Sequence, residues 1–542
     1  MNRKGTTQRT DRASGAKTKR TRRTTSAPKA AATGEACLLG TIDVGSNSIR
    51  LAVVEVRPDG SRTFLEELQQ PVRLGVDTFA HGAISPDSMR ATCEVINQFK
   101  DVLATYKVDT VRAVATSAVR EADNRDTFID RVAQETGIGL ETIEAVEESS
   151  LTFSYLRNFL GDRHGFDDGG LVIDIGAGSV EIMLVRGGNL VFSESQRTGT
   201  LRLLQLLGGA SERRALQILG PFIQQNINIF GRVHPLCEIE TLFVNCPLAA
   251  RAFADTPGVE WSGAVAHLAP DRLREIAREA YGLDANARAG RFDIRASEAE
   301  ELLPSLMIIE RFLDLACAER VVVFDVSMID CLIHDMTSAG ADRDRSLEFE
   351  QQVRSGAKFI GEKYHFDREH HEHVTWLTLT LFDALEDLHG LGPHARLLLE
   401  TAGILHDIGI YVSTRAHHKH SAYLVAASEI AGLSEDDIRI VSNVVRYHRK
   451  AMPKAAHTEY NILSRDDRLM VSKLSAILRI ADALDRSHRR RIKSLRVELT
   501  PSELVLWAES HEELSIEEWA LPAKADFFKS LYGLEVVLRR DR

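Results

Sequence analysis

The sequence lacks the features that mark membrane-spanning and secreted proteins. No uninterrupted apolar run approaches the roughly 18 residues that a transmembrane helix needs. The six cysteines are scattered and form no C-x-x-C pair, which argues against a disulfide framework and against a cysteine zinc site. The N-terminal residues contain no apolar segment of the kind found in signal peptides. These absences predict a protein of the reducing cytoplasm with no membrane partner.

Charge is distributed unevenly along the chain. The net charge is −11, but residues 1–34 hold ten Lys/Arg and a single acid, so they carry +9 and the remainder carries −20. A segment rich in Thr, Ala, Ser, Lys and Arg is typical of a disordered, solvated arm. A second interpretation is an electrostatic tether for a polyanion such as RNA or polyphosphate.

The 542 residues exceed what one hydrophobic core can organise, so several domains are expected. Strand and helix patterns alternate from about residue 40, restart at Leu171, and give way to almost continuous helix over 345–495. Strand-like alternation returns at the end of the chain. We therefore divide the sequence into five parts: a basic tail 1–36, α/β segments 37–165 and 166–336, a helical domain 337–495, and a small α/β segment 496–542.

One strand–turn–strand pattern occurs twice. "TIDVGSNSIRLAVVEV" begins at Thr41 and "LVIDIGAGSVEIMLVRGG" begins at Leu171. In each copy an Asp ends an apolar strand, a small-residue turn follows, and a second apolar strand returns. Backbone N–H groups of such a turn can bind phosphate oxygens, and small side chains let the ligand approach. Two copies in consecutive α/β segments indicate a duplicated fold that grips one phosphate chain from both sides.

The predicted phosphate-binding residues come from both turns. They are Asp43, Gly45, Ser46, Asn47, Ser48, Gly176, Ala177, Gly178 and Ser179. Asp43 and Asp174 end the two strands, where a carboxylate can hold Mg²⁺ or orient water against a phosphoryl group.

These turns resemble the two phosphate loops of the exopolyphosphatase/guanosine pentaphosphate phosphohydrolase family, a branch of the sugar kinase/Hsp70/actin superfamily. "AVATSAVREADN" and "RTGTLRL" resemble further family motifs, and "LHDIG", "HHKHSAYL", "RYHRKAMP" and "LRIADALDRSH" resemble its C-terminal helical domain. The resemblance implies a duplicated actin-like (ribonuclease H-like) two-subdomain fold of the ATPase type. It also implies an all-α HD-type domain and a small C-terminal α/β segment after it. The homodimer expected here rests on the same resemblance.

The resemblance also implies roles for four side chains. Arg120 would reach the substrate phosphates, Asp174 and Glu181 would position Mg²⁺ and the attacking water, and Glu148 would be the general base. Glu147 remains the alternative base, because "IEAVEESSLTF" is shorter than the family's usual pattern and lacks its Arg. Two other departures are Ala177 in place of Gly, and "NCPLAARA" in place of a Gly-Gly-Thr turn. Pro247 has no N–H to donate to a phosphate there.

Histidines are concentrated in the helical part: twelve of the 19 lie between His365 and His457. His370, His406, Asp407 and Asp482 match the metal set of HD-domain phosphohydrolases. Imidazole and carboxylate ligands suit Mn²⁺ or another divalent transition metal with an open position for water. His418, His420 and His448 are candidates for a second metal position. The alternative is that His–Asp pairs only join the helices.

Three functions stay open at this stage. The first is a Mg²⁺-dependent hydrolase that removes terminal phosphate from inorganic polyphosphate or the 5′-phosphate of guanosine pentaphosphate. The second is an HD-type metallophosphohydrolase whose front half is a regulatory module. The third is a polyphosphate or alarmone sensor.

The basic tail leads to a first prediction. Deleting residues 1–35 should raise the KM for long-chain polyphosphate at low salt and leave KM for short oligomers nearly unchanged, because a long polyanion can contact tail and cleft together. Initial rates of phosphate release on both substrates measure this. Equal KM values for the deleted and full-length proteins on long chains would identify the tail as a solvated arm.

Overall fold

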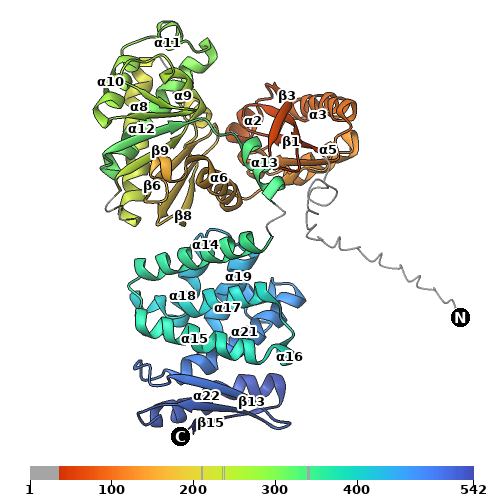
Figure 1. Ribbon diagram of the computed structural model, residues 1–542, viewed down its shortest axis with the longest axis vertical. Helices are drawn as coiled ribbons and strands as arrows, with labels where there is room; N and C mark the ends of the chain where they lie inside the picture. The colour runs from red at the N-terminus through yellow and green to blue at the C-terminus, as the bar shows by residue number, and fades with distance from the viewer. Residues whose placement is uncertain (1–35, 209–211, 235, 237–238, 339–341, 542) are drawn as a thin grey trace, which may run out of the picture.

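The structure is a computed structural model that describes residues 36–208, 212–234, 236, 239–338 and 342–541. The predicted basic tail 1–36 therefore lies almost wholly outside the described residues. Two α/β lobes lie side by side, a helical domain lies below them, and a small sheet occupies the C-terminal end (Figure 1). Among the described residues, no helix has the length and apolar character needed to cross a membrane.

The first lobe is built on a five-stranded sheet of order β3-β2-β1-β4-β5. Its strands are β1 (Cys37–Val44), β2 (Ile49–Val56), β3 (Arg62–Gln70), β4 (Thr110–Ala115) and β5 (Glu141–Thr142). Its helices are α2 (Leu74–His81), α3 (Pro86–Tyr106), α4 (Ser117–Arg120) and α5 (Arg125–Thr136). Ser85 caps α3 by accepting a hydrogen bond from the Ser88 amide, and Pro86 occupies the first turn, a Ser-Pro pair that is typical of a helix start.

The second lobe has a seven-stranded sheet of order β10-β11-β12-β9-β6-β7-β8. Its strands are β6 (Gly169–Ile175), β7 (Val180–Arg186), β8 (Asn189–Gln196), β9 (Thr241–Asn245), β10 (Glu260–Ser262), β11 (Val265–Leu268) and β12 (Arg320–Phe324). Its helices are α7 (Thr200–Leu207), α8 (Glu212–Val233), α9 (Pro247–Phe253), α10 (Pro270–Tyr281), α11 (Ala285–Arg291) and α12 (Ala296–Ala316).

The two lobes repeat one topology. β1 pairs antiparallel with β2 and parallel with β4, just as β6 pairs antiparallel with β7 and parallel with β9. The registers match as well, since Asp43 lies opposite Arg50 and Asp174 lies opposite Glu181. The duplication inferred from the repeated hairpin is therefore present in the fold, and the α/β class predicted for the front half is confirmed.

Two helices connect the lobes in a way that the predicted boundaries at 165 and 336 do not describe. Helix α6 (Ala145–Leu160), assigned by sequence to the first segment, packs Phe153 and Leu156 against Val172 of the second sheet. Helix α13 (Met328–Ser338), assigned to the second, returns to the first sheet and packs against β1 and β2 through its apolar face. Each helix therefore packs on the sheet of the lobe to which the sequence did not assign it, because its apolar face fits that sheet.

The remaining chain forms the helical domain and the C-terminal sheet. The helices are α14 (Asp342–Lys363), α15 (Arg368–Ala384), α16 (Glu386–His389), α17 (Pro393–Leu405), α18 (His417–Ala426), α19 (Glu435–Tyr447), α20 (Thr458–Asn461) and α21 (Arg465–Leu484). The C-terminal part contains β13 (Ser494–Leu499), β14 (Glu503–Glu509), α22 (Ser515–Tyr532) and β15 (Glu535–Asp541). Both parts share one apolar core, so the small sheet is packed onto the helices rather than tethered to them.

The helical domain also packs against the second lobe. Helix α14 crosses its upper side, facing the lobes (Figure 1). Phe359 of α14 contacts Phe192 of β8 with ring centroids 5.7 Å apart, and Ser150 of α6 donates to Gln352 at 3.3 Å. These contacts place the helical domain beside the helix that carries the predicted base.

Close packing at Gly170 in β6 gives a second prediction. A Cβ added there would lie 2.6 Å from the Thr241 carbonyl oxygen and 2.7 Å from the Phe243 ring. Gly170→Ala should therefore cost about 1–3 kcal/mol and lower the apparent melting temperature. Gly139→Ala is the matched control, because nothing lies within 4 Å of an added Cβ there. Identical melting of the two variants would contradict the described approach of β6 and β9.

Candidate functional sites: an interlobe cleft and a histidine cluster

The two predicted phosphate loops have the same internal hydrogen bond. Gly45 N–H donates to the Ser48 carbonyl at 3.1 Å, and Gly176 N–H donates to the Ser179 carbonyl at 3.0 Å. In both loops an added Cβ on the glycine would come within about 3 Å of that carbonyl. The matching turns follow directly from the duplicated strand–turn–strand sequence.

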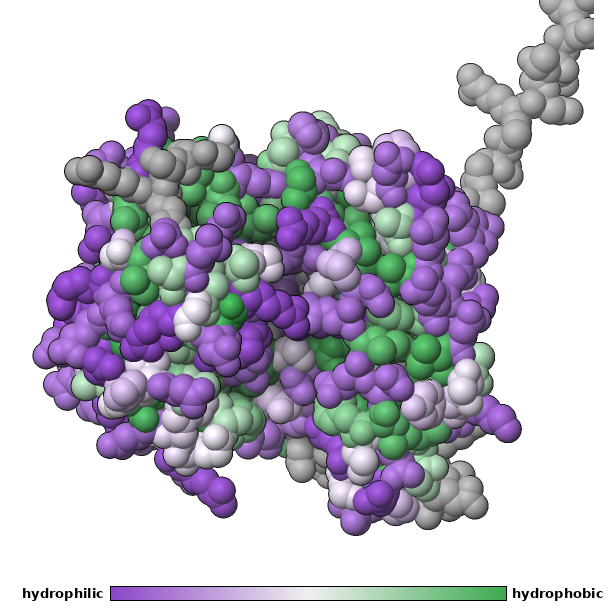
Figure 2. Space-filling view, turned by 90° about the horizontal axis from the view of Figure 1, so that it is seen from above, coloured by the Kyte–Doolittle hydropathy of each residue, from purple (hydrophilic) through white to green (hydrophobic). Residues whose placement is uncertain are grey.

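The loops meet where the two lobes face one another. A Cβ on Gly178 would lie 2.5 Å from Ser117 Oγ and 3.1 Å from Ser46 Oγ, both in the first lobe. Ser46 and Ser117 are themselves hydrogen-bonded at 2.9 Å. Seen from above, a hollow separates the two lobes, with hydrophilic side chains along it (Figure 2). Of the remaining loop residues, Asn47 donates across the lobes to Glu301 at 3.4 Å, and Ser48 accepts from Gln69 at 2.9 Å.

An arginine of the second lobe stabilises the close contact between the two loops. Arg202 donates through Nε to the Gly178 carbonyl at 3.0 Å and through Nη2 to both oxygens of Glu121 at 2.9 and 3.0 Å. Its guanidinium also lies 3.9 Å from the centroid of the Phe79 ring. Charge-assisted and cation–π contacts thus join the second loop to helices of the first lobe.

Three carboxyl groups gather at the strand ends. Burial raises the pKa of Asp43 to about 6, that of Asp174 to about 7 and that of Glu181 to about 8, and the Glu148 charge adds to each shift. Glu181 Oε1 accepts from Ser179 and Ser195, whereas Glu181 Oε2 and Asp43 Oδ1 are buried without a hydrogen-bond partner in the described part of the chain. Buried acids with unused oxygens form a donor set suited to a hard divalent cation.

Arg120 faces these acids from α4. Its Nη1 donates to Glu148 Oε2 at 2.9 Å and to the Ile143 carbonyl at 2.9 Å. Glu147, the alternative base, points elsewhere: its Oε1 lies 3.6 Å from Arg112 Nη2, and its side chain is 46% exposed. The geometry therefore brings Arg120, Asp174, Glu181 and Glu148 into one cleft and leaves Glu147 outside it.

The segment that replaces the expected Gly-Gly-Thr turn makes hydrogen bonds within the protein. Cys246 N–H donates to the Phe324 carbonyl at 3.1 Å, and Pro247 begins α9 without an N–H. Burial raises the pKa of the Cys246 thiol to about 11, although hydrogen bonds from Ala249, Ser305 and Leu248 oppose the shift. Asn245 Nδ2 donates to Asp174 at 3.1 Å, so this strand end orients a carboxylate instead of offering amides to a phosphate.

The histidine cluster lies in the helical domain. His370 Nε2 and His406 Nε2 are each 4.0 Å from Asp482 Oδ1, and His406 Nε2 is 3.8 Å from Asp407 Oδ2. All four side chains are buried. The four predicted ligands, from α15, α17 with its following turn, and α21, therefore converge as the sequence pattern indicated.

Hydrogen bonds on the outer nitrogens orient these rings. His370 Nδ1 contacts Asp485 Oδ2 at 2.8 Å, and His406 Nδ1 contacts the Gly403 carbonyl at 2.8 Å. A proton on Nδ1 leaves the Nε2 lone pair directed inward, as in metal-binding histidines. Neither Nε2 has a hydrogen-bond partner among the residues that the structure describes. Burial lowers the pKa of His406 to about 4, which keeps the ring neutral and able to bind a metal.

The second oxygen of Asp407 faces other histidines. Oδ1 lies 3.1 Å from His417 Nε2 and 3.3 Å from His448 Nε2. His448 was among the predicted additional ligands, but His418 and His420 do not join a cluster in the described part of the chain. His417, one position earlier at the start of α18, occupies that place, because the turn before the helix directs its ring toward Asp407.

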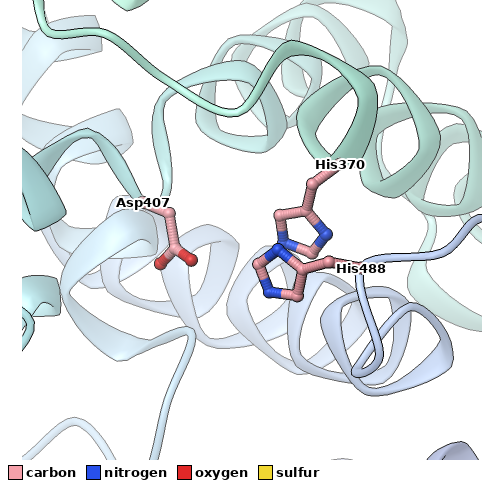
Figure 3. Close-up of side chains that lie close together, drawn as sticks. All are labelled: His370, Asp407 and His488. Atoms are coloured by element: carbon pink, nitrogen blue, oxygen red, sulfur yellow. The ribbon is translucent and has the colours of Figure 1, made fainter.

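Two further side chains were missed by sequence reasoning. His488, after α21, stacks on His370 with ring centroids 3.6 Å apart and faces Asp407 (Figure 3). Lys524 of α22 hydrogen-bonds Asp482 and the His448 carbonyl. Lys524 stands in no quoted motif. His488 stands in the quoted "LRIADALDRSH", but the sequence pattern predicted no role for it.

Comparisons with known proteins identify the family. The model of the Ppx/GppA phosphatase family matches residues 53–215, and the model of domain III of Ppx/GppA phosphatases matches residues 353–526. Together they cover more than half of the chain, on either side of the interlobe cleft and over the histidine cluster. The chain belongs to the Ppx/GppA phosphatase family.

Individual relatives align with this chain over most of its length. A guanosine-5′-triphosphate,3′-diphosphate pyrophosphatase of Vibrio vulnificus is 26% identical over 86% of this chain and 90% of its own length. The protein of the same name from Aliivibrio fischeri is 24% identical over 88% and 96%. Among solved structures, an exopolyphosphatase from Cytophaga hutchinsonii superposes with a TM-score of 0.49 at 20% identity, covering 56% of this chain and 98% of that one.

The raised pKa of Glu181 gives a third prediction, for protein freed of divalent metal. The pKa of Glu181 in the folded state is about 8, so the folded state holds the proton up to that pH, whereas an unfolded chain releases it near the ordinary glutamate value of 4.5. Stability should therefore fall as pH rises from about 5 to 8, by at least about 1 kcal/mol for this group. Glu181→Gln should flatten the fall of apparent melting temperature across that interval.

Glu94→Gln, on an exposed face of α3, is the control and should follow the wild-type curve. A Glu181→Gln curve parallel to wild type would show that Glu181 is ionised throughout and that the burial argument is wrong.

Proposed function

We propose that this chain is a Mg²⁺-dependent phosphohydrolase that removes the terminal phosphate from guanosine pentaphosphate or inorganic polyphosphate in the interlobe cleft. A hydrolase acting on phosphoric anhydrides agrees with the family and with the names of the relatives. The observation that carries the proposal is the meeting of two loops with the same internal hydrogen bond beside Arg120 and a set of carboxylates. We also propose that the lobes are of the actin-like type.

The roles of the residues follow from what in-line attack on a phosphate needs. The loop N–H groups other than those of Gly45 and Gly176, together with the Arg120 guanidinium, bind the terminal phosphate. Glu148, 2.9 Å from Arg120, accepts a proton from the attacking water; the water oxygen bonds to phosphorus and the anhydride P–O bond breaks. Because Arg120 and Glu148 are hydrogen-bonded, a phosphate that draws Arg120 away would free the carboxylate.

Asp174, Glu181 and Asp43 are proposed to hold Mg²⁺. The unpartnered oxygens of Asp43 and Glu181, beside the Asp174 carboxylate, fit a cation that binds oxygen ligands. Mg²⁺ bound there would neutralise part of the charge of the phosphate chain. Asn245, which holds Asp174, keeps one oxygen of that carboxylate oriented.

The relatives by sequence favour guanosine pentaphosphate as the first substrate to test. The amides after β9 are used internally, so the two loops carry the phosphate chain without a third turn. This arrangement predicts weaker substrate binding than a cleft with three glycine-rich turns.

A fourth prediction separates the two candidate bases. Glu148→Gln should lower kcat for phosphate release by about a hundredfold or more, because general-base catalysis contributes that much. Glu147→Gln is the matched control, one residue away on the same helix, and should keep kcat close to wild type. Coupled-assay kinetics on guanosine pentaphosphate and tripolyphosphate measure both. The reverse order of effects would assign the role to Glu147.

A second candidate function rests on the histidine cluster. We propose that His370, His406, Asp407 and Asp482 bind Mn²⁺ or another divalent transition metal in an HD-type domain, and that His448 and His417 add a second position across Asp407. Inward Nε2 atoms without partners support this donor set. Such a metal would supply an activated water, so the helical domain is a candidate second hydrolytic site.

The fifth prediction tests that metal site. Elemental analysis of dialysed protein should find transition metal, and added Mn²⁺ should raise the melting temperature. The double variant His406→Ala/Asp407→Ala should lose both effects, whereas His511→Ala, exposed in the C-terminal part, should keep them. Absence of metal together with no response to Mn²⁺ would leave the cluster as a structural His–Asp network.

The cytoplasmic location, the homodimer and the tethering role of the basic tail are proposed on the sequence arguments. Free cysteines, four of the five described ones buried, are compatible with a reducing compartment. The polyanionic substrate gives the basic tail a chemically suitable partner.

A further inference from the structure

A small pocket opens beside the histidine cluster, between α15 and the loop that joins α21 to β13. Its volume is about 230 Å³, and its lining residues are Glu372, His373, Trp376, Arg490, Ile492 and Lys493. The same loop carries His488 and the same helix carries His370, but none of the lining residues belongs to the proposed metal set. The pocket is therefore a separate feature of the helical domain.

One wall of the pocket is aromatic. Trp376 is 37% exposed, and its indole stacks with His373 at a centroid distance of 5.3 Å and an interplanar angle of 24°. His373 is 92% buried (8% exposed), yet its Nε2 has no hydrogen-bond partner in the described part of the chain. A flat exposed ring beside an unused buried nitrogen suits a planar ligand with polar edges.

Two lining residues of the pocket, Arg490 and Lys493, are cationic. Lys493 Nζ donates to the Arg490 carbonyl at 3.0 Å, and Arg490 Nη1 lies 3.8 Å from Glu369. The acid in the lining, Glu372, is already held by Arg368 at 3.0 Å. Arg490 is 44% exposed at its side chain, so both cations can turn toward an anion at the rim.

We propose that this pocket binds a purine nucleotide, with the base stacked on Trp376 and the phosphates at Arg490 and Lys493. The volume fits a base and part of a ribose, so the phosphates remain at the rim beside the cations. An inorganic phosphate chain would leave the aromatic wall unused, and an uncharged aromatic ligand would leave the cations unused. This inference does not depend on the hydrolytic reaction proposed for the interlobe cleft.

The test is a fluorescence titration of the full-length protein with GDP and with ADP. The Trp376 signal is obtained by subtracting the fluorescence change of Trp376→Phe from that of the wild type. This subtraction cancels quenching that arises at any other site, including the cleft. Saturable quenching of that difference signal below about 1 mM is the expected result. Trp376→Phe should still bind the nucleotide in a calorimetric titration, because a stacking ring remains.

Arg490→Ala and Lys493→Ala should each weaken binding by about tenfold, as expected when a charge-assisted hydrogen bond is lost. Arg539→Ala is the matched control, since Arg539 is 49% exposed and lies 4.0 Å from Glu503, much as Arg490 lies near Glu369. Tripolyphosphate should not change the difference signal. No saturable signal with either nucleotide, or an equal signal with tripolyphosphate, would overturn the proposal.

Discussion

The close approach of Gly178 to Ser46 and Ser117 is the contact on which the front half of the molecule depends. No side chain fits there, because even a Cβ would collide with the Ser117 hydroxyl. The second loop can therefore reach the first, and Arg202 fixes it by bonding the Gly178 carbonyl and Glu121 together. Without this approach the two loops would be separate turns, and the single phosphate site that we propose between them could not form.

The same approach explains the charge pattern of the cleft. Burial raises the pKa values of Asp43, Asp174 and Glu181 to about 6, 7 and 8. Arg50 opposes the shift at Asp43, a hydrogen bond from Asn245 opposes it at Asp174, and Arg120 with hydrogen bonds from Ser195 and Ser179 opposes it at Glu181. Burial of like charges is costly unless protons or a cation compensate. A fold that keeps this arrangement is poised to bind a divalent metal together with an anionic substrate.

The helical domain also gathers buried ionisable side chains, but most of them are histidines instead of carboxylates. Its histidines are oriented by Asp485 and by backbone carbonyls, so their inward atoms are ring nitrogens instead of carboxylate oxygens. Oxygen ligands of the kind found in the front cleft suit the Mg²⁺ proposed there, and imidazole ligands suit the transition metal proposed for the cluster. Lys524 reaches the cluster from α22 and His488 reaches it from the loop between α21 and β13, so the C-terminal helix contributes to the surroundings of the cluster.

Local patterns in the sequence predicted the parts of the structure that depend on neighbouring residues. The repeated hairpins, the cap at Ser85 and the helical stretch over 345–495 follow from apolar periodicity and turn residues. The swapped packing of α6 and α13 could not be predicted, because it is decided by which sheet their apolar faces fit. His417 replaced His418 for a comparable reason: one residue of register at a helix start sets which ring points inward.

The choice between Glu148 and Glu147 also depends on a contact that the local sequence does not reveal. Both stand in the first turn of α6, and only the position of Arg120, 28 residues earlier, distinguishes them. The use of Asn245 to orient Asp174 is equally non-local, since it joins two strands 71 residues apart. Motif resemblance indicated the residues of the proposed site, and the three-dimensional contacts show which of them lie together.

The most direct test of the central claim is anomalous diffraction at the manganese edge from crystals grown with Mn²⁺ and tripolyphosphate. The account predicts a manganese peak between the two loops, bound by the carboxylates of Asp174 and Glu181, with the terminal phosphate against Arg120. Manganese and tripolyphosphate found only at the histidine cluster, with the interlobe cleft empty, would contradict it.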